Sequence, residues 1–385
     1  MPDLNWVLTD VAKRVWRENF SVAASPELKL AGSDGWSVGK YTLRGGLSDG
    51  VDVVELNNGR LSISILPTRG MGLWRGTCDG LDLGWKSPVA QPVHPAFVNA
   101  LDRGGIGWLA GFNEWLCRCG LDANGPPSAE GTLHGRIANI PAHYVDVSIS
   151  TDGAGTISVS GVVDETMMFG PCLRLKTTVQ TTAGSNRLTI IDELTNLAGT
   201  KREMELLYHT NVGGPFLEAG SRFVAPVVAV APRDKTAAAG IDSFSKYVGP
   251  VAGYAEQVFY CELAADKTGR TQTMLVNAAG DKGLSLAYDT RQLPCFALWK
   301  NTQAEADGFC TGLEPATNFP NLKEFERQQG RVMVLPPGGK HTAVLEIGVH
   351  SSREMVRGVE QEIAALQKGH EPKVHSQARE GWSPG

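Results

Sequence analysis

Residues 51–66, VDVVELNNGRLSISIL, alternate apolar and polar side chains on either side of one turn signal. The central Asn57-Asn58-Gly59 is typical of a tight β-hairpin turn, because Asn and Gly tolerate the left-handed backbone that such turns require. Residues 61–66 then return with a period of two, which is the repeat of a strand that buries one face. The stretch therefore predicts two antiparallel strands joined by a hairpin.

The same punctuation continues along the chain, which contains 45 glycines and 21 prolines between short β-branched runs. Helical periodicity is scarce, so strands and turns dominate the prediction. Consecutive antiparallel strands in this number favour large packed sheets over parallel β/α units. We therefore predict an all-β fold, a large antiparallel β-sandwich with few short helices. Its strands are expected at residues 144–150, 156–163, 173–182, 187–195, 204–210, 258–263, 271–276, 284–289 and 296–301.

The two ends of the chain depart from this pattern and divide the prediction into three regions. Residues 1–35 are expected to form an N-terminal extension, helical or irregular, and residues 36–350 the sandwich domain. Ser352 can cap a C-terminal helix in the region 351–385, whose polar end is expected to fray. The helix expected in the N-terminal extension is indicated by a stripe of apolar side chains with helical spacing, Leu8, Val11, Val15 and Trp16.

The composition argues against some classes of function, among them nucleic-acid binding and membrane association. The 385 residues carry a net charge of −5, from 36 Lys and Arg against 41 Asp and Glu, so no polyanionic partner such as nucleic acid is indicated. The first ten residues lack a signal-peptide pattern, and no stretch approaches the ~18 apolar residues of a membrane span. We therefore expect a cytoplasmic protein that does not associate with a membrane.

The cysteines point away from disulfides and metal. Seven cysteines, an odd number in a long chain, suit a reducing compartment in which thiols stay free. Cys117-Arg118-Cys119 is the one close pair in the sequence, and it lacks a second pair at the spacing of a zinc site. We expect both thiols to be small buried apolar groups, and no metal ligand is assigned.

A carboxylate and an imidazole supply the first candidate chemistry. Glu314 lies in TGLEPATNFP, residues 311–320, where Gly and Pro predict a loop. His209 lies in a predicted strand whose alternation places it on one face with Asn211. A Glu and a His on separate elements are the minimum equipment for adding a proton to one substrate atom while removing one from another. Either residue alone is more often structural, so the hypothesis depends on the pair.

Four further residues join this candidate site. His134 precedes a glycine, which lets the backbone approach a neighbour closely. Arg69 lies in a Gly-rich bend after a strand, where its planar fork of donors could hold a polar ligand. Trp299 and Lys300 end an apolar strand shortly before the glutamate, and an indole ring can stack on the apolar face of a sugar. Each of these residues also has an ordinary structural interpretation, as a core side chain or a surface cation.

Three of these elements resemble the aldose 1-epimerase or galactose mutarotase superfamily, and within it a bacterial branch of unknown function. Leu133-His134-Gly135 is similar to the family's Leu-His-Gly-Gly element, with Arg136 in place of the second glycine. Tyr208-His209-Thr210-Asn211 resembles the strand that holds the family's general acid. Gly312-Leu313-Glu314-Pro315 resembles the loop that holds its general base. The family's substrate-binding Asp has Asp234 as its nearest candidate in this chain.

The resemblance implies the fold of a galactose mutarotase-like sandwich and an aldose 1-epimerase activity on a free or modified aldose. Glu314 would take the proton from the C1 hydroxyl, and His209 would protonate the ring oxygen, so that the ring opens and recloses. A small sugar is the expected partner, and the chemistry needs no metal or organic cofactor. The residues expected to contact the sugar are His134, Arg69, Asn211, Lys300 and Trp299.

Three alternatives stay open. Lys300 could act with Glu314 and His209 in another isomerisation or an elimination on a sugar derivative. The chain could instead be a carbohydrate-binding protein without catalysis, because a fold does not fix a function. The candidate His and Glu side chains could also be structural. Exposed edges of large sheets often pair, so a homodimer is one expectation for the oligomeric state.

Overall fold

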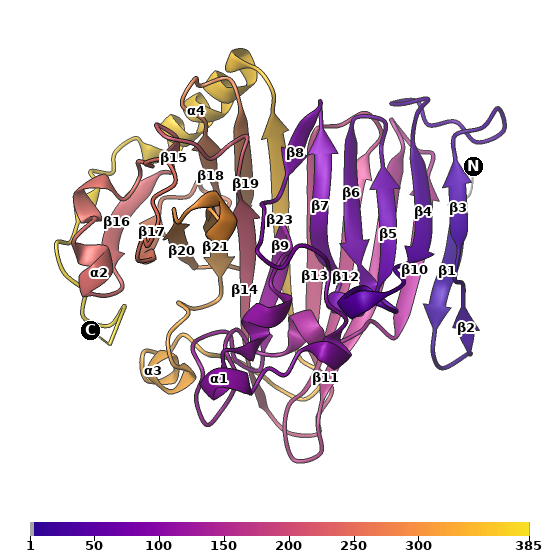
Figure 1. Cartoon of the computed structure of the whole chain (residues 1–385), viewed down its shortest axis with the longest axis horizontal. Coiled ribbons are helices and arrows are strands. Elements are labelled where there is room, and N and C mark those ends of the chain that lie inside the picture. Colours follow the sequence, from indigo (N-terminus) through magenta and orange to yellow (C-terminus); the bar gives the residue numbers. More distant parts are fainter. Residues whose placement is uncertain (1–3, 385) are drawn as a thin grey trace.

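The computed structural model describes residues 4–384 and consists mainly of strands in two large sheets, which we call sheet A and sheet B (Figure 1). Their neighbouring strands are antiparallel, apart from one short parallel pair at the edge of sheet B. The described helices are short, except for one near the C-terminus. The predicted all-β sandwich with few helices is therefore confirmed.

Both sheets place side by side some strands that are distant in the sequence. From edge to edge, sheet A runs β15 (Arg222–Val224), β18 (Arg270–Val276), β19 (Gly283–Asp289), β23 (Lys340–His350), β13 (Arg187–Asn196), β12 (Cys172–Thr182), β11 (Thr156–Thr166), β10 (Tyr144–Ser150), β1 (Leu4–Asp10) and β2 (Val15–Trp16). Sheet B runs β24 (Lys373–Val374), β16 (Val227–Pro232), β17 (Gln257–Leu263), β20 (Cys295–Asn301), β21 (Cys310–Ala316), β14 (Arg202–Val212), β9 (Leu116–Leu121), β7 (Gly72–Cys78), β6 (Leu61–Leu66), β5 (Asp52–Asn57), β4 (Ser37–Thr42) and β3 (Phe20–Ala23). Off this path, β22 (Met333–Leu335) pairs with β14 and β8 (Leu81–Leu83) with β7. The α-helices are α1 (Asp102–Gly105), α2 (Lys235–Ala238), α3 (Lys323–Gln328) and α4 (Arg353–Gln367).

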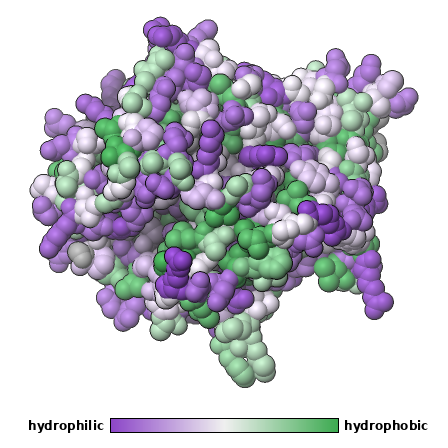
Figure 2. Space-filling view, in the orientation of Figure 1, coloured by the Kyte–Doolittle hydropathy of each residue, from purple (hydrophilic) through white to green (hydrophobic). Residues whose placement is uncertain are grey.

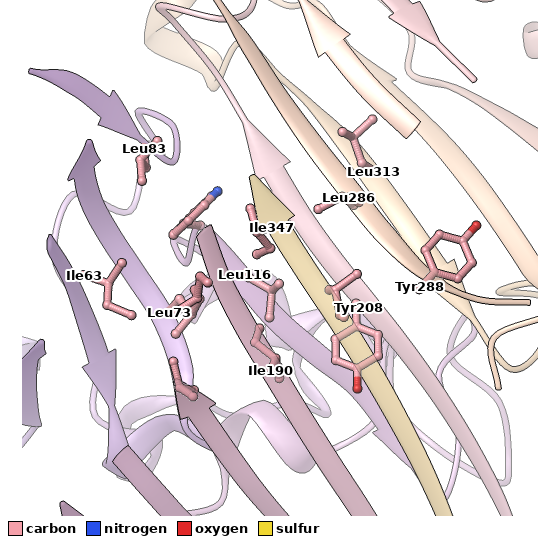
Figure 3. Packing of buried hydrophobic residues seen from close by; sticks show 14 of the residues in the cluster. Ile63, Leu73, Leu83, Leu116, Ile190, Tyr208, Leu286, Tyr288, Leu313 and Ile347 are labelled. Atoms are coloured by element: carbon pink, nitrogen blue, oxygen red, sulfur yellow. The ribbon is translucent and has the colours of Figure 1, made fainter. Parts of the chain in front are cut away.

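One hydrophobic core lies between the two sheets. Along β13 every second side chain is buried, as expected for a strand with one face inward. Sheet A contributes Ile190, Leu286 and Ile347 to the core, and Figure 3 shows them close to side chains of sheet B. The labelled side chains from sheet B include Ile63, Leu73, Leu116, Tyr208 and Leu313. The opposite face of sheet B, its outer face, is not part of this core and can hold functional side chains.

A buried ion pair connects the sheets inside this core. Arg118 of β9 contacts Asp192 of β13 at 2.5 Å, and the Tyr208 hydroxyl donates to the same carboxylate at 2.8 Å. Arg118 also donates to Thr177 of β12 at 2.6 Å. Removing one member of such a network would leave an unpaired charge in the core, which is costly. The network thus links β9 and its neighbours to sheet A.

The hairpin predicted at residues 51–66 is present. Val54 pairs with Ile65 across β5 and β6. The turn is fixed by Asn58, whose side-chain oxygen accepts the backbone N–H of Leu61 at 2.7 Å. Its amide nitrogen donates to Thr181 in the opposite sheet at 2.7 Å. The same side chain therefore sets the turn and attaches it to sheet A.

The helix predicted near the N-terminus is wrong. Residues 4–10 form β1, which pairs with β10 at the edge of sheet A, and Leu4 lies opposite Ile149. Of the apolar stripe only Leu8 is fully buried, while Val11 and Trp16 are exposed. Pairing with an available sheet edge has overridden the local helical pattern, as tertiary context often does. Positions 1–3 of the predicted extension and position 385 of the tail lie outside the described residues.

The C-terminal region contains the predicted helix, α4, whose N-cap is Ser352. The Ser352 hydroxyl accepts the backbone N–H of Met355 at 3.3 Å, and Val356 on the buried side of the helix packs with Met274 and Val276 of β18. The expectation that the following tail frays is wrong. β24 pairs with β16, and the carbonyl of Trp382 accepts a hydrogen bond from Asn321 at 2.9 Å. The tail thus packs onto the end of sheet B that carries β16 and β17.

An irregular segment between β8 and β9 covers the outer face of sheet B. Residues 84–115 include α1 and short 3-10 turns, and lie in the lower middle of Figure 1. Their Trp108 and Phe112 pack on side chains of β9 and β14. Figure 2 shows apolar surface in the same part of the molecule. The exposed apolar side chains of this segment include Phe97, Leu101, Ile106 and Leu109.

Candidate active site

Two neighbouring strands of sheet B bring Glu314 and His209 together. Thr210 of β14 pairs with Leu313 of β21, and these two face the core, so the flanking His209 and Glu314 both project from the outer face. His209 Nε2 lies 3.3 Å from Glu314 Oε1. Their side chains are 5% and 4% exposed. The structure therefore joins, in one buried pair, the two residues that the sequence suggested as acid and base.

Glu314 lies in a strand, so the loop predicted around it is wrong. The sequence TGLEPA belongs to β21 although it contains Gly and Pro. Gly312 has a specific role there, because a Cβ at this position would lie 2.3 Å from Glu314 Oε1. The glycine that suggested a loop instead leaves room for the carboxylate above the strand.

The two titratable groups are shifted in opposite directions. Burial raises the pKa of Glu314 to about 8, Glu256 adds to the rise, and Arg233 opposes it. Burial holds the pKa of His209 well below its ordinary value, and neighbouring His134 lowers it further, while Asn211 opposes the shift. Around neutral pH the pair therefore holds one dissociable proton, which either Glu314 or His209 can carry. Within the described residues, Glu314 Oε1 and His209 Nδ1 have no hydrogen-bond partner.

Aromatic rings surround the imidazole of His209. Edge-on contacts place the ring centroids of Phe112, Trp299 and His134 at 5.1, 5.3 and 5.4 Å from it. Trp108 closes the circle through contacts with His134 at 4.9 Å and Phe112 at 4.7 Å. Such rings exclude water and offer apolar faces to a ligand. We refer to Trp108, Phe112 and Trp299 as the aromatic wall.

His134 reaches the pair from a strained turn. Its φ is 58°, in the left-handed region that few non-glycine residues adopt, and Gly135 follows at 69°. A Cβ at Gly135 would lie 2.2 Å from the carbonyl oxygen of Ala123, which explains the glycine. His134 Nδ1 lies 2.9 Å from the carbonyl oxygen of Asn124, so Nδ1 carries the proton and Nε2 is left as an acceptor. Burial lowers the pKa of His134, which keeps the ring neutral.

Arg69 is not at the surface of the site. It is fully buried, with Nε at 2.6 Å from Glu114 Oε1. Both terminal nitrogens are also engaged, by the carbonyl oxygens of Val93 and Gly111 and by the side chain of Asn139. These bonds fasten the irregular segment that carries Trp108 and Phe112 of the aromatic wall. The geometry therefore gives Arg69 a supporting position, with its guanidinium buried and every nitrogen already bonded within the protein.

Lys300 and Asn211 occupy opposite faces of sheet B. Lys300 lies on the core face, where its Nζ donates to the carbonyl oxygens of Lys246 at 2.6 Å and Ser243 at 3.1 Å. The structure does not bring it to Glu314. Asn211 lies on the outer face with His209, and its amide donates to the carbonyl oxygen of Glu114 at 2.9 Å. Its Oδ1 has no partner within residues 4–384, so Asn211 can still accept from a ligand.

Two charged residues near the pair were not predicted. Glu256 accepts a hydrogen bond from Trp299 Nε1 at 2.6 Å and forms an ion pair with Arg233 at 3.3 Å. Arg233 also contacts Asp234 at 3.0 Å, and Asp234 caps α2 through the N–H of Ala237. The sequence offered one signal, an Arg-Asp pair at the end of a strand, and none for Glu256. Asp234, the candidate for a substrate-binding Asp, is thus engaged by α2 and Arg233.

Two cavities of the described structure lie away from this pair. One of about 800 Å3 is lined by Arg75 and Trp85 among others, and one of about 590 Å3 by Phe169 and Lys323 among others; neither is lined by the pair itself. No group of His, Cys, Asp and Glu side chains within residues 4–384 could hold a metal ion. The same residues contain no helix long and apolar enough to cross a membrane.

Cys117 and Cys119 lie on β9, across from β14, on the outer face beneath the aromatic wall. Both are fully buried, and burial raises the pKa of both thiols. Buried thiols of this kind are poor nucleophiles and metal ligands. The structure thus places the two cysteines in the packing under the pair.

Comparisons with known proteins show the family and the fold of the chain. A family model described as a domain of unknown function, DUF4432, matches residues 48–349. A crystal structure from Klebsiella pneumoniae, of a protein provisionally named an aldose 1-epimerase, is 35% identical, has a TM-score of 0.94, and covers 97% of this chain and 98% of that one. Among curated proteins, none matches this chain.

More distant structures share the fold. A galactose mutarotase-like protein from Clostridium acetobutylicum is 15% identical with a TM-score of 0.55, and covers 78% of this chain and 96% of that one. A protein from Escherichia coli, also provisionally named an aldose 1-epimerase, is 13% identical with a TM-score of 0.50 and covers 78% and 100%. The chain therefore belongs to the DUF4432 family and has the galactose mutarotase-like β-sandwich fold.

Proposed function

We propose that this protein is an aldose 1-epimerase, an isomerase that interconverts the anomers of an aldose. The observation that supports this most is the buried contact of 3.3 Å between His209 and Glu314. An acid and a base held this close on adjacent strands can exchange protons with two oxygens of one sugar ring. The resemblance to the Klebsiella pneumoniae structure supports the same reaction class.

In the proposed reaction Glu314 removes the proton from the C1 hydroxyl as the bond between C1 and the ring oxygen breaks. His209 gives its proton to the ring oxygen, and the sugar becomes an open aldehyde. After rotation about the bond between C1 and C2, the two residues exchange roles and the ring closes on the other face. The protons balance, because the pair gives one proton and takes one in each direction.

The opposite pKa shifts suit these roles. A raised pKa makes the Glu314 carboxylate a stronger base, and a lowered pKa makes the His209 imidazolium a stronger acid. The tautomer with the proton on His209 is the reactive one, and it has the same proton count as the tautomer with the proton on Glu314. General acid and base contributions of about 10²- to 10⁴-fold each are enough for a reaction that already proceeds slowly in water.

The remaining outer-face residues are proposed as sugar ligands. His134 Nε2 and Asn211 Oδ1 are acceptors for sugar hydroxyls. The protein already bonds the other ring nitrogen of His134 and the amide nitrogen of Asn211. Trp299 and Phe112 offer ring faces to the apolar side of the sugar. Arg69 and Lys300 are omitted from this list, since their donors are already bound elsewhere.

Saturation-transfer NMR of anomer exchange over a panel of free aldoses tests the proposal. Wild type is compared with Glu314→Gln, which keeps the shape of the side chain and removes the base. Glu262→Gln, an exposed carboxylate of β17, is the matched control. We expect exchange of at least one aldose to be accelerated by wild type and by the control, and not by Glu314→Gln. If no aldose exchanges faster, or if Glu314→Gln retains the acceleration, the proposed function is wrong.

A further inference from the structure

The charge at the rim of the site is unbalanced. A single guanidinium, that of Arg233, is shared between two carboxylates, at 3.0 Å from Asp234 and 3.3 Å from Glu256. One guanidinium against two carboxylates leaves an excess of negative charge there. The acid–base pair adds no charge to this sum, because it holds one proton.

This rim is close to the reacting groups. Glu256 holds the indole of Trp299 at 2.6 Å, and Trp299 lies edge-on to the His209 ring at 5.3 Å. Glu256 and Arg233 are also the charged side chains that act on the pKa values of Glu314 and His134. Their side chains are 50% and 32% exposed, so they stand where the site meets water.

The other cationic side chains near the site are already bonded to protein groups. Arg69 is buried against Glu114 with all of its nitrogens engaged. Lys300 faces the core and donates to two carbonyl oxygens. A site that recognises phosphate or carboxylate normally presents an Arg or Lys with free donors. The remaining cation, Arg233 at the rim, is already bonded to Asp234 through Nε and to Glu256 through Nη2.

We infer that Glu256 is a specificity residue that repels anionic sugars, and that the substrate is an uncharged aldose. The inference rests on the proposed function and adds the substrate class to it. An approaching phosphate or carboxylate meets a like charge at the rim and must compete with Asp234 and Glu256 for the one guanidinium there. A neutral sugar has no such cost, and its hydroxyls can use the acceptors of His134 and Asn211.

The test compares two sugars that differ in one charged group. The probes are the free aldose that exchanges fastest and its 6-phosphate, each with wild type, Glu256→Gln and the control Glu262→Gln. Glutamine keeps an oxygen that can accept the Trp299 N–H, so the change is mainly one of charge. The readout is the ratio of kcat/KM for the two sugars, in which any effect on the chemistry common to both cancels.

In wild type the ratio should strongly favour the neutral sugar, and Glu256→Gln should reduce it by about tenfold, the scale of one charge acting on a phosphate across a partly wet site. The control should leave it unchanged. Raising the ionic strength should speed exchange of the 6-phosphate by wild type, because salt screens the repulsion, and should not affect the neutral sugar.

The inference is overturned if wild type prefers the 6-phosphate, or if Glu256→Gln leaves the ratio as it is. A different result, no accelerated exchange for any aldose, would contradict the proposed function instead. In that case a free aldose that binds and its 6-phosphate are titrated against wild type and Glu256→Gln, and the ratio of their Kd values tests the repulsion alone.

Discussion

At the scale of residues, burial shifts the pKa values of both members of the pair in the directions that the proposed reaction needs. Glu314 and His209 sit on adjacent strands under an aromatic wall, and desolvation favours the neutral form of each. The sequence pointed to both residues. Strand alternation places His209 on one face of its strand with Asn211, and Gly312-Leu313-Glu314-Pro315 resembles the loop that holds the general base of the aldose 1-epimerase superfamily. It could not point to Glu256, since only the folded chain brings that carboxylate to Trp299.

A pH profile of kcat/KM follows from these shifts. Above about pH 8 the pair loses the proton that the ring oxygen needs, and below the lowered pKa of His209 it gains a second proton, so that the base is lost. We expect a bell with its alkaline limb near pH 8 and its acid limb below pH 6.5, after the uncatalysed rate is subtracted. Glu256→Gln should move the alkaline limb to lower pH, because Glu256 raises the pKa of Glu314. An alkaline limb that stays in place in this variant would contradict the assignment of Glu314.

At the scale of elements, glycines and a buried ion pair decide where the site residues lie. The segment from β8 to β9 has little regular structure, so its position depends on side-chain bonds to Arg69. The sequence indicated the strands themselves with good boundaries, because alternation and turn residues are local signals. It predicted a helix in place of β1, because a strand that pairs at a sheet edge depends on β10, which lies far along the chain.

Arg69→Met is expected to destabilise the protein. The change leaves Glu114 buried without its cation, which costs about 3–5 kcal/mol in free energy of unfolding when a buried pair is broken. Urea or thermal unfolding monitored by tryptophan fluorescence measures the loss. Arg291→Met, which breaks an exposed pair with Asp289, is the control and should give no measurable change. Equal stability of the two variants would refute the supporting role of Arg69.

Gly312→Ala is expected to lower activity more than stability. The added Cβ would lie 2.3 Å from Glu314 Oε1, so the carboxylate must leave its present position beside His209. A displacement of this size costs about 10²-fold in rate where the reacting groups must be aligned. Anomer exchange and thermal unfolding are measured side by side. Gly199→Ala, with open space at its Cβ, is the control, and a Gly312→Ala variant with wild-type activity would contradict the proposed geometry.

At the scale of the whole molecule, buried carboxyls make stability depend on pH. Burial raises the pKa of Glu205 to about 8 and of Glu165 to about 7. The folded state therefore binds protons that the unfolded state releases above the ordinary pKa of 4.5. The stability that this binding contributes is fully present below pH 4.5 and is lost as pH rises through 7 to 8. Buried histidines such as His350, with a pKa lowered to about 4, act in the opposite direction up to pH 6.5.

Between pH 6.5 and 8 the histidines no longer contribute and the buried carboxyls titrate, so the free energy of unfolding should fall. Lys300, whose pKa burial lowers to about 8, opposes this fall as the pH reaches 8. The fall should be at most about 1.4 kcal/mol per pH unit for each carboxyl. Chemical denaturation at a series of pH values measures it. Glu205→Gln should make the fall shallower, and an unchanged slope in this variant would show that Glu205 is ionised in the folded protein.

The claim that His209 and Glu314 act as one unit is tested most directly by a double-mutant comparison of anomer exchange. The rate is measured on the fastest-exchanging aldose for wild type, His209→Asn, Glu314→Gln and the double variant. If the two residues pass protons in one concerted step, each single change removes most of the acceleration, and the double variant is about as slow as the slower single variant. Losses that multiply in the double variant, or a single variant that keeps the wild-type rate, would contradict the account.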